Sequence, residues 1–199
     1  MSTTFDWYMI RALGLVAIGA FTVSAVLGAS SVRGGRTPGA MDRRLVRQLV
    51  HRSTALIGLG ALVGHLAFVL IDTYVPTSLS GMLVPFTAGY RPFALGLGSL
   101  ALYALVLTAA SGWLRGGFAG RVSDVVWRRI HFASYVGWAL AVGHGFLAGS
   151  DSHTSWAELG YVGCLALVAG AAAWRFLGAE PDRMLDHAGR RRLIHRSVR

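Results

Sequence analysis

Four of the seven histidines lie inside or at the ends of two long apolar stretches, and they are the residues best placed to do chemistry. His51 and His65 belong to the stretch 45–71, and His131 and His144 belong to the stretch 125–147. Ionisable side chains are costly inside a membrane and usually mark functional positions there. Four of them in matched positions therefore indicate one site with two levels, in which each stretch contributes one histidine per level.

The spacing of the four histidines agrees with two levels if both stretches run from the inside to the outside of the membrane. The separations are 65 − 51 = 14 and 144 − 131 = 13 residues, and at about 1.5 Å per residue each is roughly 20 Å of helix rise. A haem iron that carries single electrons needs two axial ligands on opposite sides of the macrocycle, and imidazoles supply them in helical bundles. The pattern therefore predicts two haems, each held by two facing histidines. They are expected to be of the non-covalent b type, because one cysteine cannot form a Cys-x-x-Cys-His attachment motif.

Helical periodicity fits one pair of ligands better than the other. Fourteen residues return to within about 40° of the same face, so His51 and His65 point the same way. Thirteen residues leave His131 and His144 on different faces, so that stretch must twist, contain a bulge or point its ligands unequally. Glycines near the ligands either make room for a porphyrin or pack helices closely. They are Gly58, Gly60, Gly64, Gly137, Gly143 and Gly145.

Arginines near each level are candidates for binding the carboxylates of a haem, because a buried carboxylate without a partner is costly. Arg52, Arg128 and Arg129 lie at the level of His51, and Arg91 ends the loop before the third apolar stretch. The rule that positively charged loops stay in the cytoplasm explains the positions of Arg52, Arg128 and Arg129 equally well. It does not explain the position of Arg91. The remaining histidines are expected to be solvated surface residues, and they are His153, His187 and His195.

The elements that must position these residues are membrane helices. Of the 199 residues, 54% are hydrophobic and 14% are charged, whereas an ordinary soluble domain has about 25% charged residues. A helix needs about 20 apolar residues to cross a bilayer, and five stretches qualify, at 8–30, 45–71, 92–114, 125–147 and 156–177. The predicted fold is an all-α membrane bundle of about five transmembrane helices. It forms a single domain over 1–199, with the core at about 45–177 and a basic cytoplasmic tail at 178–199.

The distribution of arginine predicts how the bundle is oriented. Arginines gather after the first stretch, after the third stretch and in the tail, whereas 72–90 and 149–155 contain none. Positively charged loops stay in the cytoplasm, so the N-terminus is predicted outside and the C-terminus inside. The expected location is the plasma membrane, as a multi-pass protein of a bacterial inner membrane. The net charge of +10 then reflects topology and lipid contact, and no nucleic-acid partner is expected.

At its four membrane histidines the sequence resembles the ferric reductase-like transmembrane domain. This is the haem-carrying core shared by NADPH oxidases, metal reductases and the membrane subunit of bacterial methionine sulfoxide reductase systems. The resemblance covers about 45–147, where thirteen residues separate His51 from His65 and twelve separate His131 from His144. It implies that His51 with His131 hold an inner haem, and that His65 with His144 hold an outer haem.

The family resemblance also implies a direction and partners. Electrons would pass from a cytoplasmic flavoprotein or a membrane quinol to the inner haem, then to the outer haem and an external acceptor. Two departures stand out, since five helices are predicted where the family usually has six, and no flavin or nicotinamide domain is visible in this sequence. An oxidoreductase activity would therefore need a separate donor, and no catalytic side chain is predicted.

Two alternatives remain open from the sequence. The first is a cytochrome that serves as the membrane anchor and relay subunit of a separate oxidoreductase, which a co-purifying flavin or molybdenum subunit would indicate. The second is a haem-free scaffold or small transporter whose histidines handle protons or metal ions. A colourless purified protein would indicate that second alternative.

The arginine distribution makes a testable prediction about topology. Single cysteines or tags at Gly34, at Gly117 and in the tail should be reachable only from the cytoplasm, because they lie in arginine-rich segments. Positions Gly81 and Ser152 should be reachable from outside. Labelling of intact cells with an impermeant thiol reagent measures this, and labelling at position 117 from outside would reverse the proposed direction of electron transfer.

Overall fold

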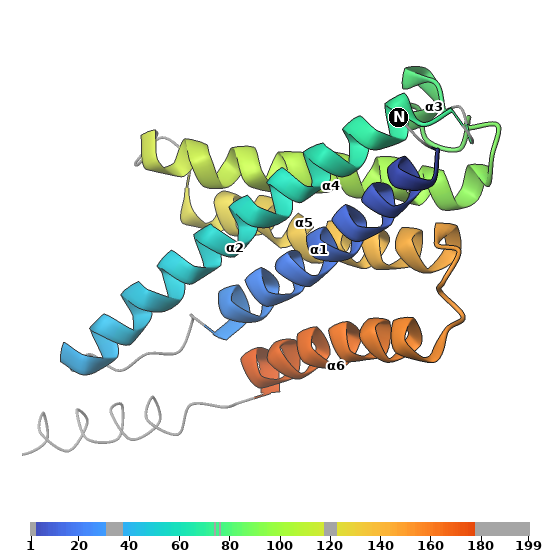
Figure 1. Ribbon diagram of the computed structural model, residues 1–199. Helices are drawn as coiled ribbons and strands as arrows, with labels where there is room; N and C mark the ends of the chain where they lie inside the picture. The colour runs from blue at the N-terminus through green and yellow to red at the C-terminus, as the bar shows by residue number, and fades with distance from the viewer. Residues whose placement is uncertain (1–2, 31–37, 74, 76, 118–122, 178–199) are drawn as a thin grey trace, which may run out of the picture.

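The protein is a bundle of helices, shown in Figure 1 as a computed structural model that describes residues 3–30, 38–73, 75, 77–117 and 123–177. Its helices are α1 (Thr3–Ser30), α2 (Pro38–Ile71), α3 (Leu79–Leu83), α4 (Pro92–Gly117), α5 (Asp124–Ala148) and α6 (Ser155–Leu177). These described ranges contain no strand, which confirms the all-α prediction. The predicted basic tail and position Gly34 lie outside the described residues.

Four helices are long and apolar enough to cross a membrane, namely α1, α2, α4 and α6. Their spans agree with four of the five predicted stretches, and the protein is a membrane protein by this measure. Helix α5 forms where the remaining span was predicted and is 25 residues long. It is not among the four apolar helices, and its sequence includes Arg128, Arg129, His131 and His144.

The long helices pair as two antiparallel hairpins. Helix α1 packs along α2, and α4 packs along α5, whereas α1 also contacts α5 and α6 (Figure 1). The core therefore forms where α1, α5 and α6 meet, around Ile18, Phe21, Trp138, Val142 and Tyr161. Helices α2 and α5 are not among the closely packed pairs of the described helices. Any contact between α2 and α5 must come from side chains that reach across the space between their backbones.

Glycines on α2 and α5 allow much of this close packing. A Cβ at Gly58 would lie 2.8 Å from the ring of Phe21, and a Cβ at Gly145 would lie 2.9 Å from Ile18. Gly64 and Gly137 are similarly crowded by side chains of α1 and α4. Of the two roles considered for the glycines beside the ligands, helix packing therefore accounts for these four.

The segment between α2 and α4 is folded against α4. Ser78 caps α3 by accepting a hydrogen bond from the backbone N–H of Gly81, at 3.0 Å. The hydroxyl of Ser99 on α4 donates to the carbonyl of Met82 at 2.6 Å. Gly81 and Ser152 are both buried, so the outward-facing labels of the topology experiment belong at the exposed neighbours, Ser80 and His153.

A buried polar bond connects the two hairpins and makes a prediction about stability. The indole N–H of Trp138 on α5 donates to the hydroxyl of Thr22 on α1 at 2.9 Å, and the two residues are only 6% and 2% exposed. Interhelical hydrogen bonds in membrane proteins contribute about 0.6 kcal/mol on average and up to about 1.7 kcal/mol. Trp138→Phe and Thr22→Val should each lower the free energy of unfolding, and the double variant should cost less than their sum.

Unfolding in mixed micelles measures this coupling between Trp138 and Thr22. The matched control is Trp113→Phe, because Trp113 is 88% exposed and its replacement should change stability little. Fully additive costs for the two buried substitutions would show that the hydrogen bond does not couple α1 to α5.

Candidate functional site

The four histidines of the two polar levels meet as two pairs across the gap between α2 and α5. The ring centres of His51 and His131 are 6.3 Å apart, and those of His65 and His144 are also 6.3 Å apart. Each pair takes one ring from α2 and one from α5, so these helices run parallel, as the arginine distribution predicted. The two levels are built from the residue pairs that sequence analysis proposed.

The His51–His131 level, predicted to be the inner one, is fixed by a hydrogen bond from His51 to helix α1. Its Nδ1 lies 2.8 Å from the carbonyl oxygen of Ser24, and a carbonyl can only accept, so Nδ1 carries the proton. The same Nδ1 lies 2.9 Å from the hydroxyl oxygen of Ser24. The other ring nitrogen, Nε2, is then unprotonated in the neutral ring and has a lone pair available for a metal.

The His65–His144 level, predicted to be the outer one, repeats this arrangement on both of its rings. Nδ1 of His65 donates to the carbonyl of Ile10 on α1, and Nδ1 of His144 donates to the carbonyl of Ala94 on α4, each at 2.8 Å. Histidines that bind metals usually donate their second N–H in this way, which fixes the tautomer and the ring orientation. Three of the four rings therefore have the hydrogen bonding of metal ligands.

The fourth ring, that of His131, is positioned by an aromatic neighbour. It stacks on Trp127 with ring centres 4.7 Å apart and planes 16° apart, and the indole N–H of Trp127 donates to the carbonyl of Ser111 on α4 at 3.2 Å. Helix α5 is α-helical from Asp124 to Ala148. The 13-residue spacing is thus accommodated without a π-bulge, and both rings of α5 still reach their partners on α2.

Three glycines on α1 and α4 give the rings their space. A Cβ at Gly98 would lie 2.8 Å from Nδ1 of His144, and a Cβ at Gly14 or Gly28 would lie 3.3 Å from the α2 histidine beside it. Sequence analysis missed all three, because it examined only glycines on the ligand helices. A signal existed, since Gly28 and Gly14 are 28 − 14 = 14 residues apart, which equals the spacing of the α2 histidines.

The ring spacing fits coordination of one metal ion between each pair. Metal–nitrogen bonds are about 2.0–2.1 Å long, and the centre of an imidazole ring lies further from the metal than the bound nitrogen does. Two imidazoles bound in line to one metal therefore have ring centres about 6.2–6.4 Å apart. Both observed separations are 6.3 Å. Among the described residues no three or more His, Cys, Asp or Glu side chains gather as a metal site. Two imidazoles per level suit an iron whose other four ligands belong to a macrocycle.

The predicted carboxylate-binding arginines lie at the two ends of the site. Arg52, Arg128 and Arg129 are exposed on α2 and α5. Arg91 donates to the last carbonyls of α5, that of Leu147 among them at 2.8 Å, and its φ is 40°. Arg91 therefore holds the end of the helix that carries His144. A role for these four arginines toward a haem carboxylate stays a prediction.

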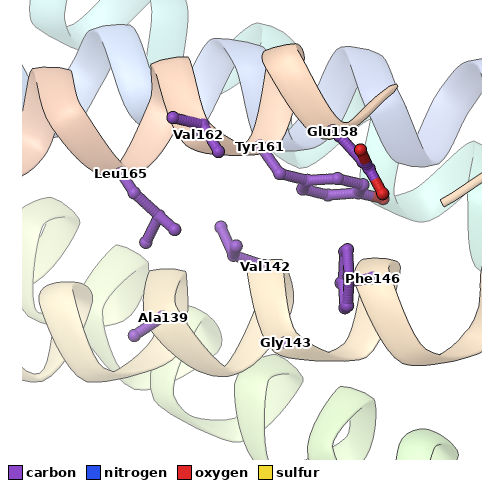
Figure 2. Close-up of a pocket in the computed structure, with 8 residues that line it drawn as sticks. All are labelled: Ala139, Val142, Gly143, Phe146, Glu158, Tyr161, Val162 and Leu165. Carbon is purple, nitrogen blue, oxygen red and sulfur yellow. The ribbon is translucent and has the colours of Figure 1, made fainter. Parts of the chain in front are cut away.

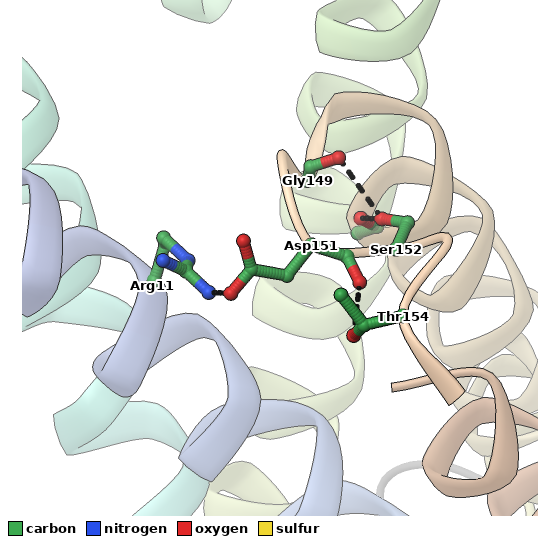
Figure 3. Close-up of polar contacts among 6 residues, drawn as sticks. Arg11, Gly149, Asp151, Ser152 and Thr154 are labelled. Carbon is green, nitrogen blue, oxygen red and sulfur yellow. Dashed lines mark hydrogen bonds and ion pairs between the residues drawn. The ribbon is translucent and has the colours of Figure 1, made fainter. Parts of the chain in front are cut away.

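An ion pair that sequence analysis missed ties the outer ends of the helices together. The guanidinium of Arg11 on α1 pairs with the carboxylate of Asp151 in the α5–α6 loop (Figure 3). Arg11 also lies over the ring of Trp7, 4.1 Å from its centre. Because Arg11 follows Ile10, whose carbonyl binds His65, this ion pair holds the backbone that orients the ring of His65.

A separate groove of about 520 Å³ lies between α5 and α6 (Figure 2). Most of its lining is apolar, with Phe146, Tyr161 and Leu165 on its walls and the carboxylate of Glu158 beside them. None of the four paired histidines lines it. It is therefore a feature of the α5–α6 contact and not of the histidine site.

The resemblance to the ferric reductase-like domain rests on the histidine pattern of the sequence alone and stays a prediction. No known protein family, no curated protein and no solved structure matches the chain.

Proposed function

We propose that this protein is a di-haem b-type cytochrome that moves electrons across a membrane. The observation that carries the proposal is the pair of facing imidazoles at each of two levels, with ring centres 6.3 Å apart. His51 and His131 would hold the inner haem, and His65 and His144 would hold the outer one. A bound haem supplies a reversible one-electron couple.

Hydrogen bonds and close packing within the chain orient the histidines for this role. Nδ1–H donation to a carbonyl keeps the Nε2 lone pair available and prevents the ring from rotating, as in known metal sites. Glycines behind the rings let α1 and α4 approach closely enough to make these bonds. With two histidines bound to each iron, a haem would have no open position for a substrate, which suits electron relay better than chemistry at the metal.

The proposal also includes a membrane arrangement. We infer that α5 is the fifth transmembrane helix, because it runs antiparallel along α4 and is as long as the apolar helices. The N-terminus is then outside and the C-terminus inside, in the plasma membrane, which in a bacterium is the inner membrane. The donor would be a cytoplasmic flavoprotein or a quinol, and the acceptor would be external.

Removing single ligands tests the assignment of the two haems. His65→Ala and His144→Ala should each lower the haem content from two to one per chain, and the double variant should lose little more, because the two residues share one site. His51→Ala or His131→Ala should remove the other haem. Haem content per protein and the absorption spectrum of each purified variant provide the measurement.

The control for the ligand variants is His153→Ala. His153 is exposed, and its ring lies against Phe146 with centres 5.5 Å apart. This variant should keep both haems. If His65→Ala keeps two haems with unchanged spectra, or if His153→Ala loses one, the ligand assignment is wrong.

The glycine behind His144 provides a test that leaves every ligand in place. In Gly98→Ala the new methyl group would lie 2.8 Å from Nδ1 of His144, so the ring must shift and its bond to the Ala94 carbonyl must weaken. We expect lower occupancy of the outer haem, by about tenfold in affinity, which is typical for loss of a partner of a metal ligand.

The matched control is Gly112→Ala on the same helix, where an added Cβ meets nothing within 4 Å. It should keep wild-type haem content. Equal haem loss from both glycine variants would point to a general effect on α4, and no loss from Gly98→Ala would contradict the close contact between this glycine and the ligand.

A further inference from the structure

Ser24 makes an unusual set of contacts with the inner ligand. It is 6% exposed on α1. Its carbonyl oxygen lies 2.8 Å from Nδ1 of His51, its hydroxyl oxygen lies 2.9 Å from the same Nδ1, and that hydroxyl lies 3.3 Å from the carbonyl oxygen of His51. One arrangement satisfies all three distances, in which Nδ1–H is shared between the two Ser24 oxygens and the hydroxyl donates to the His51 carbonyl.

This behaviour differs from that of three threonine hydroxyl groups in the helices. Thr22, Thr54 and Thr108 each donate to the carbonyl four residues earlier in their own helix, as hydroxyl groups in apolar helices commonly do. The hydroxyl of Ser24 instead bonds across to α2. It therefore acts on the ligand and not only on its own backbone.

The outer level has no counterpart to this hydroxyl in the described contacts of its two rings. Nδ1 of His65 bonds to the Ile10 carbonyl, and Nδ1 of His144 bonds to the Ala94 carbonyl. Of the three rings whose Nδ1 donates to a carbonyl, that of His51 alone also shares the bond with a side chain. The two levels thus differ in the hydrogen bonding of their ligands.

We infer that Ser24 is a positioning residue that lowers the reduction potential of the inner haem, an inference that rests on the proposed function. Hydrogen bonding at Nδ1–H makes the opposite nitrogen, Nε2, a stronger electron donor to a metal. A stronger donor favours the oxidised iron, and such bonds are among the means by which proteins set haem potentials. A lower potential at the inner level makes transfer to the outer level more favourable, so Ser24 helps to give electron flow its direction.

Ser24→Ala tests this inference in the full-length, haem-loaded protein. In a His65→Ala background only the inner haem should remain, so a redox titration reports on it alone. We expect the substitution to shift its equilibrium toward the reduced form by up to about tenfold, which is about 59 mV for a one-electron couple. Ser24→Thr, which keeps a hydroxyl group, should restore the original potential.

The matched control is Ser99→Ala on α4, because the hydroxyl of Ser99 donates to the carbonyls of Met82 and Leu95 and not to a histidine. It should leave the inner potential unchanged. An inner potential that Ser24→Ala does not raise, or that Ser99→Ala raises equally, would overturn the inference while the haem assignment stands.

A second measurement separates failure of the inference from failure of the proposed function. If the purified protein binds no haem, the proposed function fails, and ¹⁵N NMR of the histidine rings still tests the positioning role of Ser24. The ring of His51 should be fixed as the Nδ1–H tautomer in the wild-type protein, and it should show a weaker Nδ1–H hydrogen bond in Ser24→Ala. An identical His51 spectrum in the two proteins would overturn the positioning role.

Discussion

The central constraint on this protein is that an imidazole in an apolar bundle needs a partner for one nitrogen while the other must stay available. The backbone carbonyls of Ser24, Ile10 and Ala94 meet this need for three rings. A carbonyl inside a helix already accepts a bond from its own helix, but its second lone pair can accept another. Helices α2 and α5 therefore depend on neighbours that bring a carbonyl within reach of these three rings.

This requirement explains the division of the bundle into two hairpins. Helices α2 and α5 carry the four paired histidines, while α1 and α4 stand behind them and supply carbonyls and glycines. Close packing takes place within each hairpin and where α1 meets α5 and α6, so that α2 and α5 can face each other across a gap bridged by imidazoles. A flat cofactor could not enter if these two helices packed directly against each other.

Much of this arrangement could be predicted from the sequence, because it depends on composition and spacing within single helices. The helices lie close to the predicted stretches, although α2 begins at Pro38, seven residues earlier than the apolar stretch at 45 (45 − 38 = 7). Proline suits the first turn of a helix, where its missing N–H costs nothing. The pairing of the histidines by level was also predicted, since parallel helices with 14- and 13-residue spacings leave one combination.

The parts that could not be predicted depend on contacts between helices. The role of Ser24 arises only when α1 lies antiparallel to α2 in one register, and the pairing of Arg11 with Asp151 requires the α5–α6 loop to reach α1. Gly98 resembles any other glycine in an apolar helix until the ring of His144 is placed against it. Sequence periodicity gives the face of a helix but not the register of its neighbour.

The most direct test of the account is the reduced-minus-oxidised absorption spectrum of the purified protein, together with its haem-to-protein ratio. The two histidine pairs predict a spectrum of low-spin b-type haem and two non-covalent haems per chain. A colourless protein, expressed with adequate haem supply and correctly folded, would contradict the account and favour a haem-free role for the four histidines.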